Sequence, residues 1–230
     1  MLPEVKQRIE NEIGEQSFFK DLKADLYNFN LKKDFIEDES KYPIFNYVNE
    51  VTHRGLKAYW HDETNEYKVM INFGLNAFCL TEFFTEKAAV FVERLQPELE
   101  NILKSIDEFN GAQNVFVEQK KIPTWTYAQK IQTKLECFEL FLIPSKYLEV
   151  TNGSFVIINY CDFAINSDLA IFYNIFSDNF GSEARINGAP TVIYDFDADT
   201  LKELEERLNL NLSDQLKKIR EEAKELEGKK

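Results

Sequence analysis

The sequence predicts an α+β fold, with an antiparallel sheet of about five to seven strands flanked by helices. Apolar residues recur at helical spacing near the N-terminus, in the centre (about residues 85–109) and near the C-terminus (about residues 200–227). Between the last two regions, short segments rich in β-branched and aromatic residues follow one another without a helical pattern. Strands with such short connections pair antiparallel, because parallel pairing needs a long crossover.

Near the N-terminus the apolar spacing predicts two short helices, over residues 2–13 and 17–26, and Ser17 has the chemistry of an N-cap for the second. A hairpin is expected next. Residues 56–61 and 66–73 are rich in Tyr, Trp, Val and Ile, and they flank the polar residues 62–65.

The central helix has the strongest apolar stripe in the chain. Pro97 interrupts it, so the segment is either one kinked helix or two, with Pro97 in the first turn of the second. The stripe continues across Pro97, which favours one helix.

Seven strand candidates follow Gly111. They cover residues 114–118, 125–131, 135–143, 155–160, 169–176, 184–186 and 191–196. The last two bracket Asn187-Gly188, a sequence typical of a two-residue hairpin turn.

The C-terminal segment is expected to be helical, with a break near residues 209–214 and Ser213 as the cap of a second piece. Its leucine stripe predicts packing on the sheet or on a second chain, so a homodimer through this helix stays open. No internal repeat is recognisable, and one domain over residues 1–230 is expected.

The chain has a formal net charge of −13, from 40 acidic and 27 basic residues. Such a field favours basic partners and repels nucleic acid, anionic lipid and phosphorylated substrates. Acidic clusters occur at Glu10, Glu12 and Glu15, at residues 37–39, and at residues 62–66. We therefore expect a basic protein partner, no nucleic acid and no membrane.

The three cysteines, Cys79, Cys137 and Cys161, are widely spaced among apolar neighbours and are expected to be reduced and buried. The N-terminus lacks a secretory pattern, and no apolar run approaches the length of a membrane helix. A cytoplasmic protein is expected.

The partner-binding residues predicted from the sequence lie at the first hairpin. Tyr59 and Trp60 are of the types enriched in interfaces, and they stand beside the acidic Asp62, Glu63 and Glu66. In an alternating strand one of the two aromatic residues points away from the core, so either could bind a partner; a core role for the other is equally ordinary.

A second candidate site follows the last strand. Asp195, Asp197, Asp199 and Glu206 match the acidic positions 1, 3, 5 and 12 of a calcium-binding loop, although Thr200 replaces the glycine at position 6. This pattern therefore indicates a Ca²⁺ or Mg²⁺ ion as the candidate cofactor. The alternative is that Thr200 and Glu203 form a capping box and that the aspartates complement the helix dipole.

No complete catalytic or nucleotide-binding motif is present. The sequence therefore favours a non-catalytic binding protein that docks a basic protein through an acidic surface, such as an immunity protein or antitoxin that neutralises a toxin. The alternative is a divalent-metal-binding protein or a metal-dependent hydrolase that uses Asp195, Asp197 and Asp199.

Overall fold

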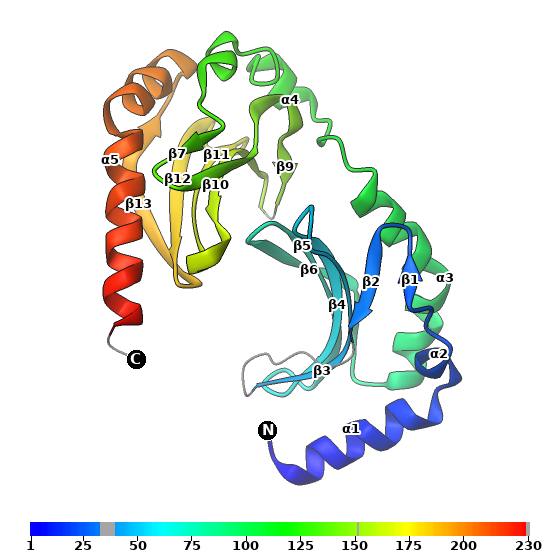
Figure 1. Ribbon diagram of the computed structural model, residues 1–230. Helices are drawn as coiled ribbons and strands as arrows, with labels where there is room; N and C mark the ends of the chain where they lie inside the picture. Colours follow the sequence, from blue (N-terminus) through cyan, green and yellow to red (C-terminus); the bar gives the residue numbers. More distant parts are fainter. Residues whose placement is uncertain (33–39, 151, 229–230) are drawn as a thin grey trace. The chain divides into compact units, whose positions relative to one another are not determined.

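The computed structural model confirms the α+β class (Figure 1). It describes residues 1–32, 40–150 and 152–228. The chain forms two compact units, Met1–Phe109 (unit 1) and Asn110–Lys230 (unit 2), and each contains its own antiparallel sheet. Whether they fold together as one domain stays a prediction.

Unit 1 is a six-stranded antiparallel meander in the order β1-β2-β3-β4-β5-β6. Its elements are α1 (Pro3–Glu15), α2 (Ser17–Lys20), β1 (Asp25–Leu26), β2 (Phe29–Lys32), β3 (Lys41–Asn49), β4 (Arg54–His61), β5 (Glu66–Phe73), β6 (Asn76–Thr85) and α3 (Ala88–Asp107). The predicted helix over residues 2–13, the hairpin of β4 and β5, and the central helix are confirmed. The central helix is continuous, with Pro97 inside it.

The helices of unit 1 cover one face of its sheet because each buries an apolar side. Ile9 of α1 is fully buried, and Phe19 of α2 packs against Phe45 of β3. The buried stripe of α3 includes Phe91, whose ring stacks 5.4 Å from that of Tyr67 on β5. The amphipathic pattern in the sequence thus determines which face of each helix meets the sheet.

Unit 2 has a seven-stranded antiparallel sheet in the order β13-β12-β11-β10-β8-β7, with β9 also paired to β10. Its helices are α4 (Val115–Gln119), η1 (Thr126–Lys130), η2 (Pro144–Lys146), η3 (Phe163–Ile165) and α5 (Leu201–Glu227). Its strands are β7 (Lys134–Leu135), β8 (Phe138–Leu142), β9 (Leu148–Glu149), β10 (Ser154–Asp162), β11 (Ser167–Asn174), β12 (Asn179–Ile186) and β13 (Ala189–Ala198).

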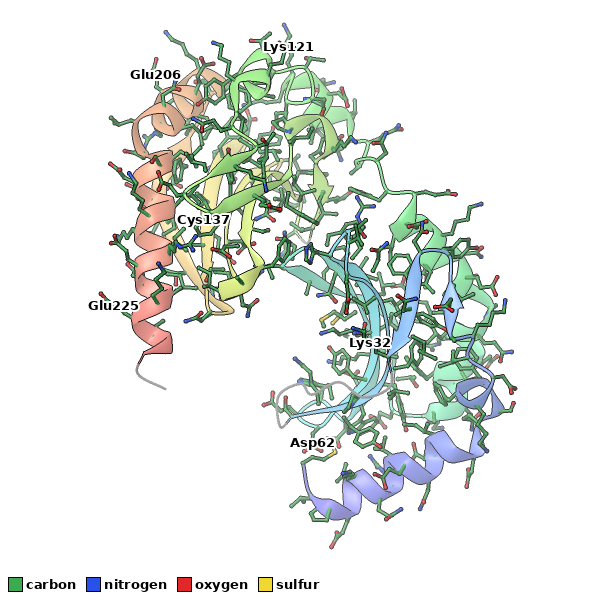
Figure 2. All side chains as sticks on the ribbon, viewed as in Figure 1. Lys32, Asp62, Lys121, Cys137, Glu206 and Glu225 are labelled. Carbon is green, nitrogen blue, oxygen red and sulfur yellow. The ribbon has the colours of Figure 1, made fainter. Side chains whose placement is uncertain are left out.

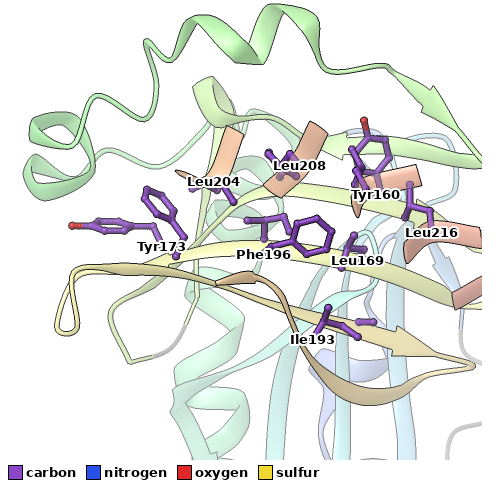
Figure 3. Close-up of a cluster of buried hydrophobic side chains, with 14 of the residues drawn as sticks. Tyr160, Leu169, Tyr173, Ile193, Phe196, Leu204, Leu208 and Leu216 are labelled. Carbon is purple, nitrogen blue, oxygen red and sulfur yellow. The ribbon is translucent and has the colours of Figure 1, made fainter. Parts of the chain in front are cut away.

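Helix α5 packs on the sheet of its own unit. Leu204, Leu208 and Leu216 lie in the same buried cluster as Phe196 of β13 and Leu169 of β11 (Figure 3). Four residues of the later stripe, Leu212, Leu216, Ile219 and Ala223, are buried as well, whereas Leu226 at its end is 45% exposed. A homodimer through this helix stays a prediction.

The predicted break in this C-terminal helix is wrong, because α5 is continuous from residue 201 to residue 227. The polar residues at the expected break make tertiary contacts instead of capping a new helix. Asn211 Nδ2 donates to the carbonyl of Asp195, and Ser213 Oγ donates to Glu136 Oε1 at 2.8 Å. Polar residues that often end helices in isolation are satisfied here by neighbouring elements.

Four other predicted elements differ from the structure. The strand expected over residues 135–143 is divided by a tight turn at Glu136 and Cys137 into β7 and β8, which pair antiparallel. Residues 114–118 and 125–131, expected as strands, are largely the helices α4 and η1. Asn114 accounts for the helix α4, because its Oδ1 accepts a hydrogen bond from Phe116 N and so caps the N-terminus of this helix. The expected helix over residues 17–26 ends after one turn at Lys20; its N-cap is Gln16, not Ser17, and Leu26 pairs with Phe29 in a hairpin.

The two units repeat the same architecture, so the expectation of no internal repeat is wrong. Strands β10, β11, β12 and β13 each begin 113 residues after β3, β4, β5 and β6, and α5 begins 113 residues after α3. The register shifts coincide too, between Pro43 and Phe45 in β3 and between Val156 and Ile158 in β10. A β-bulge at the same place in two sheets is a specific structural correspondence.

Equivalent side chains make the same contact in both units. Tyr47 on β3 donates its hydroxyl to the carbonyl of Lys23, just before β1. Tyr160 on β10 donates to the carbonyl of Gln132, just before β7. Burial raises the pKa of Tyr47 to about 12, so this hydroxyl remains a donor at neutral pH.

Candidate functional site

The aromatic residues predicted to bind a partner are buried. Trp60 is 1% exposed; its ring lies 4.9 Å from that of Tyr67, and the Arg8 guanidinium lies over the Trp60 ring, 4.9 Å from its centroid. Tyr59 points to the opposite face of β4, where its hydroxyl is 3.3 Å from Cys79 Sγ, and it too is buried. As expected for neighbouring residues of a strand, the two side chains lie on opposite faces of β4. Other residues cover both faces at this point, so both side chains are buried.

The acidic residues at the same hairpin are partly paired within the protein. Asp62, labelled in Figure 2, lies 3.5 Å from the amino group of Met1, and Glu66 lies 3.3 Å from Lys68 Nζ. Among the described residues, Glu63 has one ion-pair neighbour, His61 Nε2 at 4.0 Å, and its side chain is 76% exposed. Of the three carboxylates, Glu63 is thus the one that projects most into solvent.

A shallow groove of about 590 Å³ runs along α1, which begins beside this turn. Its lining residues are Pro3, Glu4, Gln7, Arg8, Asn11, Glu12 and Glu15. Glu12 accepts a 2.7 Å hydrogen bond from Tyr67, and Arg8 lies near both Glu12 and Trp60. Glu4 and Glu15 are exposed and make no ion pair with any residue that the structure describes.

We name Glu4, Glu15 and Glu63 together with this groove the acidic surface of unit 1. The unit carries 21 acidic and 13 basic residues, a net charge of −8. The cluster at Glu10, Glu12 and Glu15 was visible in the sequence, but only the structure shows that Glu10 and Glu12 face Tyr42 and Tyr67. The acidic cluster at residues 37–39 lies outside the described residues.

The aspartates near the end of β13 are not gathered around one point. Ser182 of β12 pairs with Ile193 of β13, and Phe180 pairs with Ala198, so β13 has three more residues than β12 between these two pairs. This bulge interrupts the alternation of the β13 side chains between the two faces of the sheet. Glu206, labelled in Figure 2, lies on α5. Its carboxylate is 4.0 Å from Lys202 Nζ. Within residues 1–32, 40–150 and 152–228, no three His, Cys, Asp or Glu side chains are placed to hold a metal ion.

The capping alternative describes this segment better. Thr200 is the N-cap of α5, and its Oγ1 accepts from Glu203 N at 3.1 Å. Glu203 Oε2 in turn accepts from Asp199 N at 3.2 Å. Burial raises the pKa of Asp197, while Arg207 acts in the opposite direction. These contacts account for Thr200 and Glu203 and for the backbone of Asp199 without a metal ion.

Replacing Thr200 by alanine is expected to destabilise the protein by about 1 kcal/mol, because Glu203 N loses its acceptor. Thr200→Ser keeps the oxygen and is the matched control. Urea unfolding followed by circular dichroism at 222 nm measures both free energies of unfolding. Equal stability of the alanine and serine variants would show that the cap contributes nothing.

A buried polar cluster in unit 2 has no counterpart among the predicted sites. Asn159 Nδ2 donates to Asp168 Oδ2 at 3.0 Å, and Cys161 Sγ donates to Asn159 Oδ1 at 3.0 Å. Arg185 lies 3.6 Å from Asp168, which is itself 2% exposed. Burial raises the pKa of Asp168 above its usual value near 3.8, and the Arg185 charge opposes this effect.

Asp168→Asn is expected to remove the contribution of this carboxyl to the pH dependence of the free energy of unfolding. A carboxyl whose pKa is raised by folding favours the folded state when protonated, so its contribution is present at acidic pH and is lost as the pH rises through the folded pKa. The free energy of unfolding of the variant, relative to that of the wild type, should therefore increase as the pH rises from 3 to 7. Urea unfolding of both proteins across this range measures the difference, and a difference that does not change with pH would contradict the assignment.

The cysteines differ in exposure, although all three are free. Cys161 is buried and Cys79 is partly buried, as the sequence predicted in outline. Cys137 is exposed, because it lies with Glu136 in the tight turn between β7 and β8, where both residues have positive φ. The prediction that it is buried is wrong: its apolar neighbour Phe138 points into the core from the adjacent strand position.

Comparisons with known proteins do not assign this chain to a family. No protein family, curated protein or solved structure matches this chain. Among the described residues, no helix combines the length and the hydropathy that crossing a membrane requires.

Proposed function

We propose that this chain is a non-catalytic binding protein that docks a basic protein partner through the acidic surface of unit 1. The observation that carries the proposal is the groove along α1, which is flanked by the exposed carboxylates of Glu4 and Glu15 and begins beside the β4–β5 turn with Glu63. None of these three carboxylates has an ion-pair partner closer than 4.0 Å among the residues that the structure describes. Trp60 supports this surface from beneath α1, whereas Tyr59 lies on the opposite face of β4, and neither is a contact residue in this proposal.

Electrostatics would act chiefly on the encounter with the partner. Opposite charges steer two proteins together and can raise the association rate 10- to 1,000-fold, an effect that salt weakens. Screening becomes strong beyond about 8 Å at physiological ionic strength, so rate and salt sensitivity report on exposed charges of this kind. A basic segment lying along α1 would meet Glu4 and Glu15 in sequence.

A toxin-neutralising protein of the immunity or antitoxin type is the concrete form of this proposal. Enzymes that act on nucleic acids carry basic substrate-binding surfaces, and an acidic protein that covers such a surface blocks access to the substrate. The net charge of −13 suits that role. Cytoplasmic location belongs to the same proposal.

The test begins with affinity capture from a lysate of the native host at low and high salt, followed by mass spectrometry. We expect a stoichiometric basic protein that elutes with salt. The association rate of that protein is then measured with the triple variant Glu4→Gln, Glu15→Gln and Glu63→Gln. It should fall at least about tenfold at low salt.

The matched control neutralises three exposed carboxylates of unit 2. Glu118→Gln, Glu149→Gln and Glu221→Gln change the net charge equally, and these side chains have no ion-pair partner among the described residues. An equal loss of rate in both triple variants would assign the effect to net charge alone and contradict the location of the site. A complex insensitive to salt would contradict the electrostatic mechanism.

A further inference from the structure

Strand β13 forms one edge of the sheet in unit 2 and is unusually exposed there. Among the strands of the described residues it pairs with β12 alone, and it is drawn beside α5 in Figure 1. Its first six residues, Ala189 to Tyr194, carry no charged side chain. Val192 is 59% exposed and Tyr194 is 71% exposed. Native proteins commonly protect such edges with charges, coverage or very short strands, because an open edge recruits another strand.

The backbone of this segment presents hydrogen-bonding groups at alternate residues. Ile186 pairs with Ala189 across the two-residue turn, and the carbonyl of Ile193 accepts from Ser182 Oγ on β12. Residues 189, 191 and 193 therefore direct their backbone groups toward β12. Pro190, Val192 and Tyr194 direct theirs toward the open side. The open stretch ends at Asp195, whose carbonyl accepts from Asn211 of α5.

We propose that this edge pairs antiparallel with the same edge of a second copy of the chain, with Val192 opposite the second copy's Val192. In this register Pro190 lies opposite Tyr194 at both ends. The side chains of these residues lie on the face away from α5 and form a continuous apolar row of Tyr-Pro, Val-Val and Pro-Tyr pairs. Two hydrogen bonds join the two Val192 residues. One further bond at each end joins Tyr194 N–H to the Pro190 carbonyl, since proline has no N–H to donate.

Charge favours a second copy over the basic partner of the proposed function. The register places Asp195 opposite Ala189 and Asp197 opposite Asn187, so no two carboxylates face each other. A basic segment would find no carboxylate within the uncharged stretch. The equivalent positions of β6 in unit 1, Cys79 and Thr81, do not offer the same pair of exposed apolar side chains, so the feature belongs to unit 2 alone.

Salt separates this inference from the proposed function. Two copies with a net charge of −13 each repel one another, and the contact itself is apolar and hydrogen-bonded. Added salt screens the repulsion, so the dimer should become more populated as ionic strength rises. Binding of a basic partner should weaken under the same change.

Light scattering coupled to size exclusion tests the dimer across protein concentration and at two salt concentrations. We expect a mass that rises toward twice 27.0 kDa for the wild type. Val192→Lys should remain at the monomer mass, because two ammonium groups would then face each other. Val51→Lys is the matched control; Val51 is 91% exposed in the β3–β4 turn, and this variant should dimerise as the wild type does. A wild type that stays monomeric at every concentration would overturn the proposal, as would a dimer that Val192→Lys leaves intact.

Cross-linking tests the register directly. Cα atoms of a hydrogen-bonded antiparallel pair are about 5.5 Å apart, within the range that a disulfide spans. In a Cys137→Ser background, which removes the exposed native thiol, Val192→Cys should oxidise to a covalent dimer. Val51→Cys in the same background should not. A failure of Val192→Cys to cross-link faster than Val51→Cys would overturn this register.

Discussion

Trp60→Ala is expected to destabilise the protein by about 3–5 kcal/mol, the range for removing a large buried aromatic side chain. Trp60 is 1% exposed and contacts both the Tyr67 ring and the Arg8 guanidinium of α1. The loss would leave a cavity beneath α1 and remove the aromatic contact with Tyr67. Urea unfolding followed by circular dichroism measures the change.

Trp60→Phe is the matched control. The indole Nε1 makes no hydrogen bond to any residue that the structure describes, so phenylalanine removes volume but no hydrogen bond. Its cost should be about 1–2 kcal/mol. If Trp60 were instead an exposed contact residue, Trp60→Ala would leave the free energy of unfolding within about 0.5 kcal/mol of the wild type. That result would contradict its burial.

Phe196→Ala is expected to have an effect of similar size, about 3–5 kcal/mol, in unit 2. Phe196 of β13 is fully buried among Leu204 and Leu208 of α5 and Leu169 of β11 (Figure 3). Removing its ring takes away part of the buried surface between α5 and the sheet. Phe196→Leu preserves much of the volume and should cost about 1–2 kcal/mol. Similar losses in the two variants would show that ring volume at this position is unimportant.

The two tryptophans can show whether the units unfold together, because Trp60 lies in unit 1 and Trp125 in unit 2. In a Trp125→Phe background, fluorescence follows Trp60 alone; in a Trp60→Phe background, it follows Trp125 alone. Adding Phe196→Ala to each background shifts the unfolding midpoint of unit 2. An equal shift at Trp60 would support the one-domain prediction, and an unchanged Trp60 transition would show two independent domains.

Local periodicity predicted the elements whose own residues decide their structure. The hairpin of β4 and β5, the turn at Asn187-Gly188 and the helix α3 follow from alternation, turn chemistry and an apolar stripe. Sequence failed where a local signal competed with tertiary contacts. Asn211 and Ser213 look like a helix break, but the carbonyl of Asp195 and the carboxylate of Glu136 satisfy them.

The candidate site was predicted only in its charges. The sequence showed the acidic residues of α1 and of residues 62–66, and the structure places α1 beside that turn through the contact of Met1 with Asp62. Whether a carboxylate is free depends on neighbours distant in sequence. Glu12 accepts a hydrogen bond from Tyr67, whereas Glu15, about one helical turn away, makes no such contact with a residue that the structure describes.

The sequence by itself determined the α+β class, the negative charge and the apolar faces of the main helices, because composition and periodicity act over a few neighbouring residues. The tertiary structure decided the burial of Trp60, the continuity of α5 and the repeat that relates β3–β6 to β10–β13. A repeat of register and bulges survives with few shared residues, such as Asn46-Tyr47 and Asn159-Tyr160, because a sheet requires a pattern of burial and hydrogen bonding that many different side chains can supply.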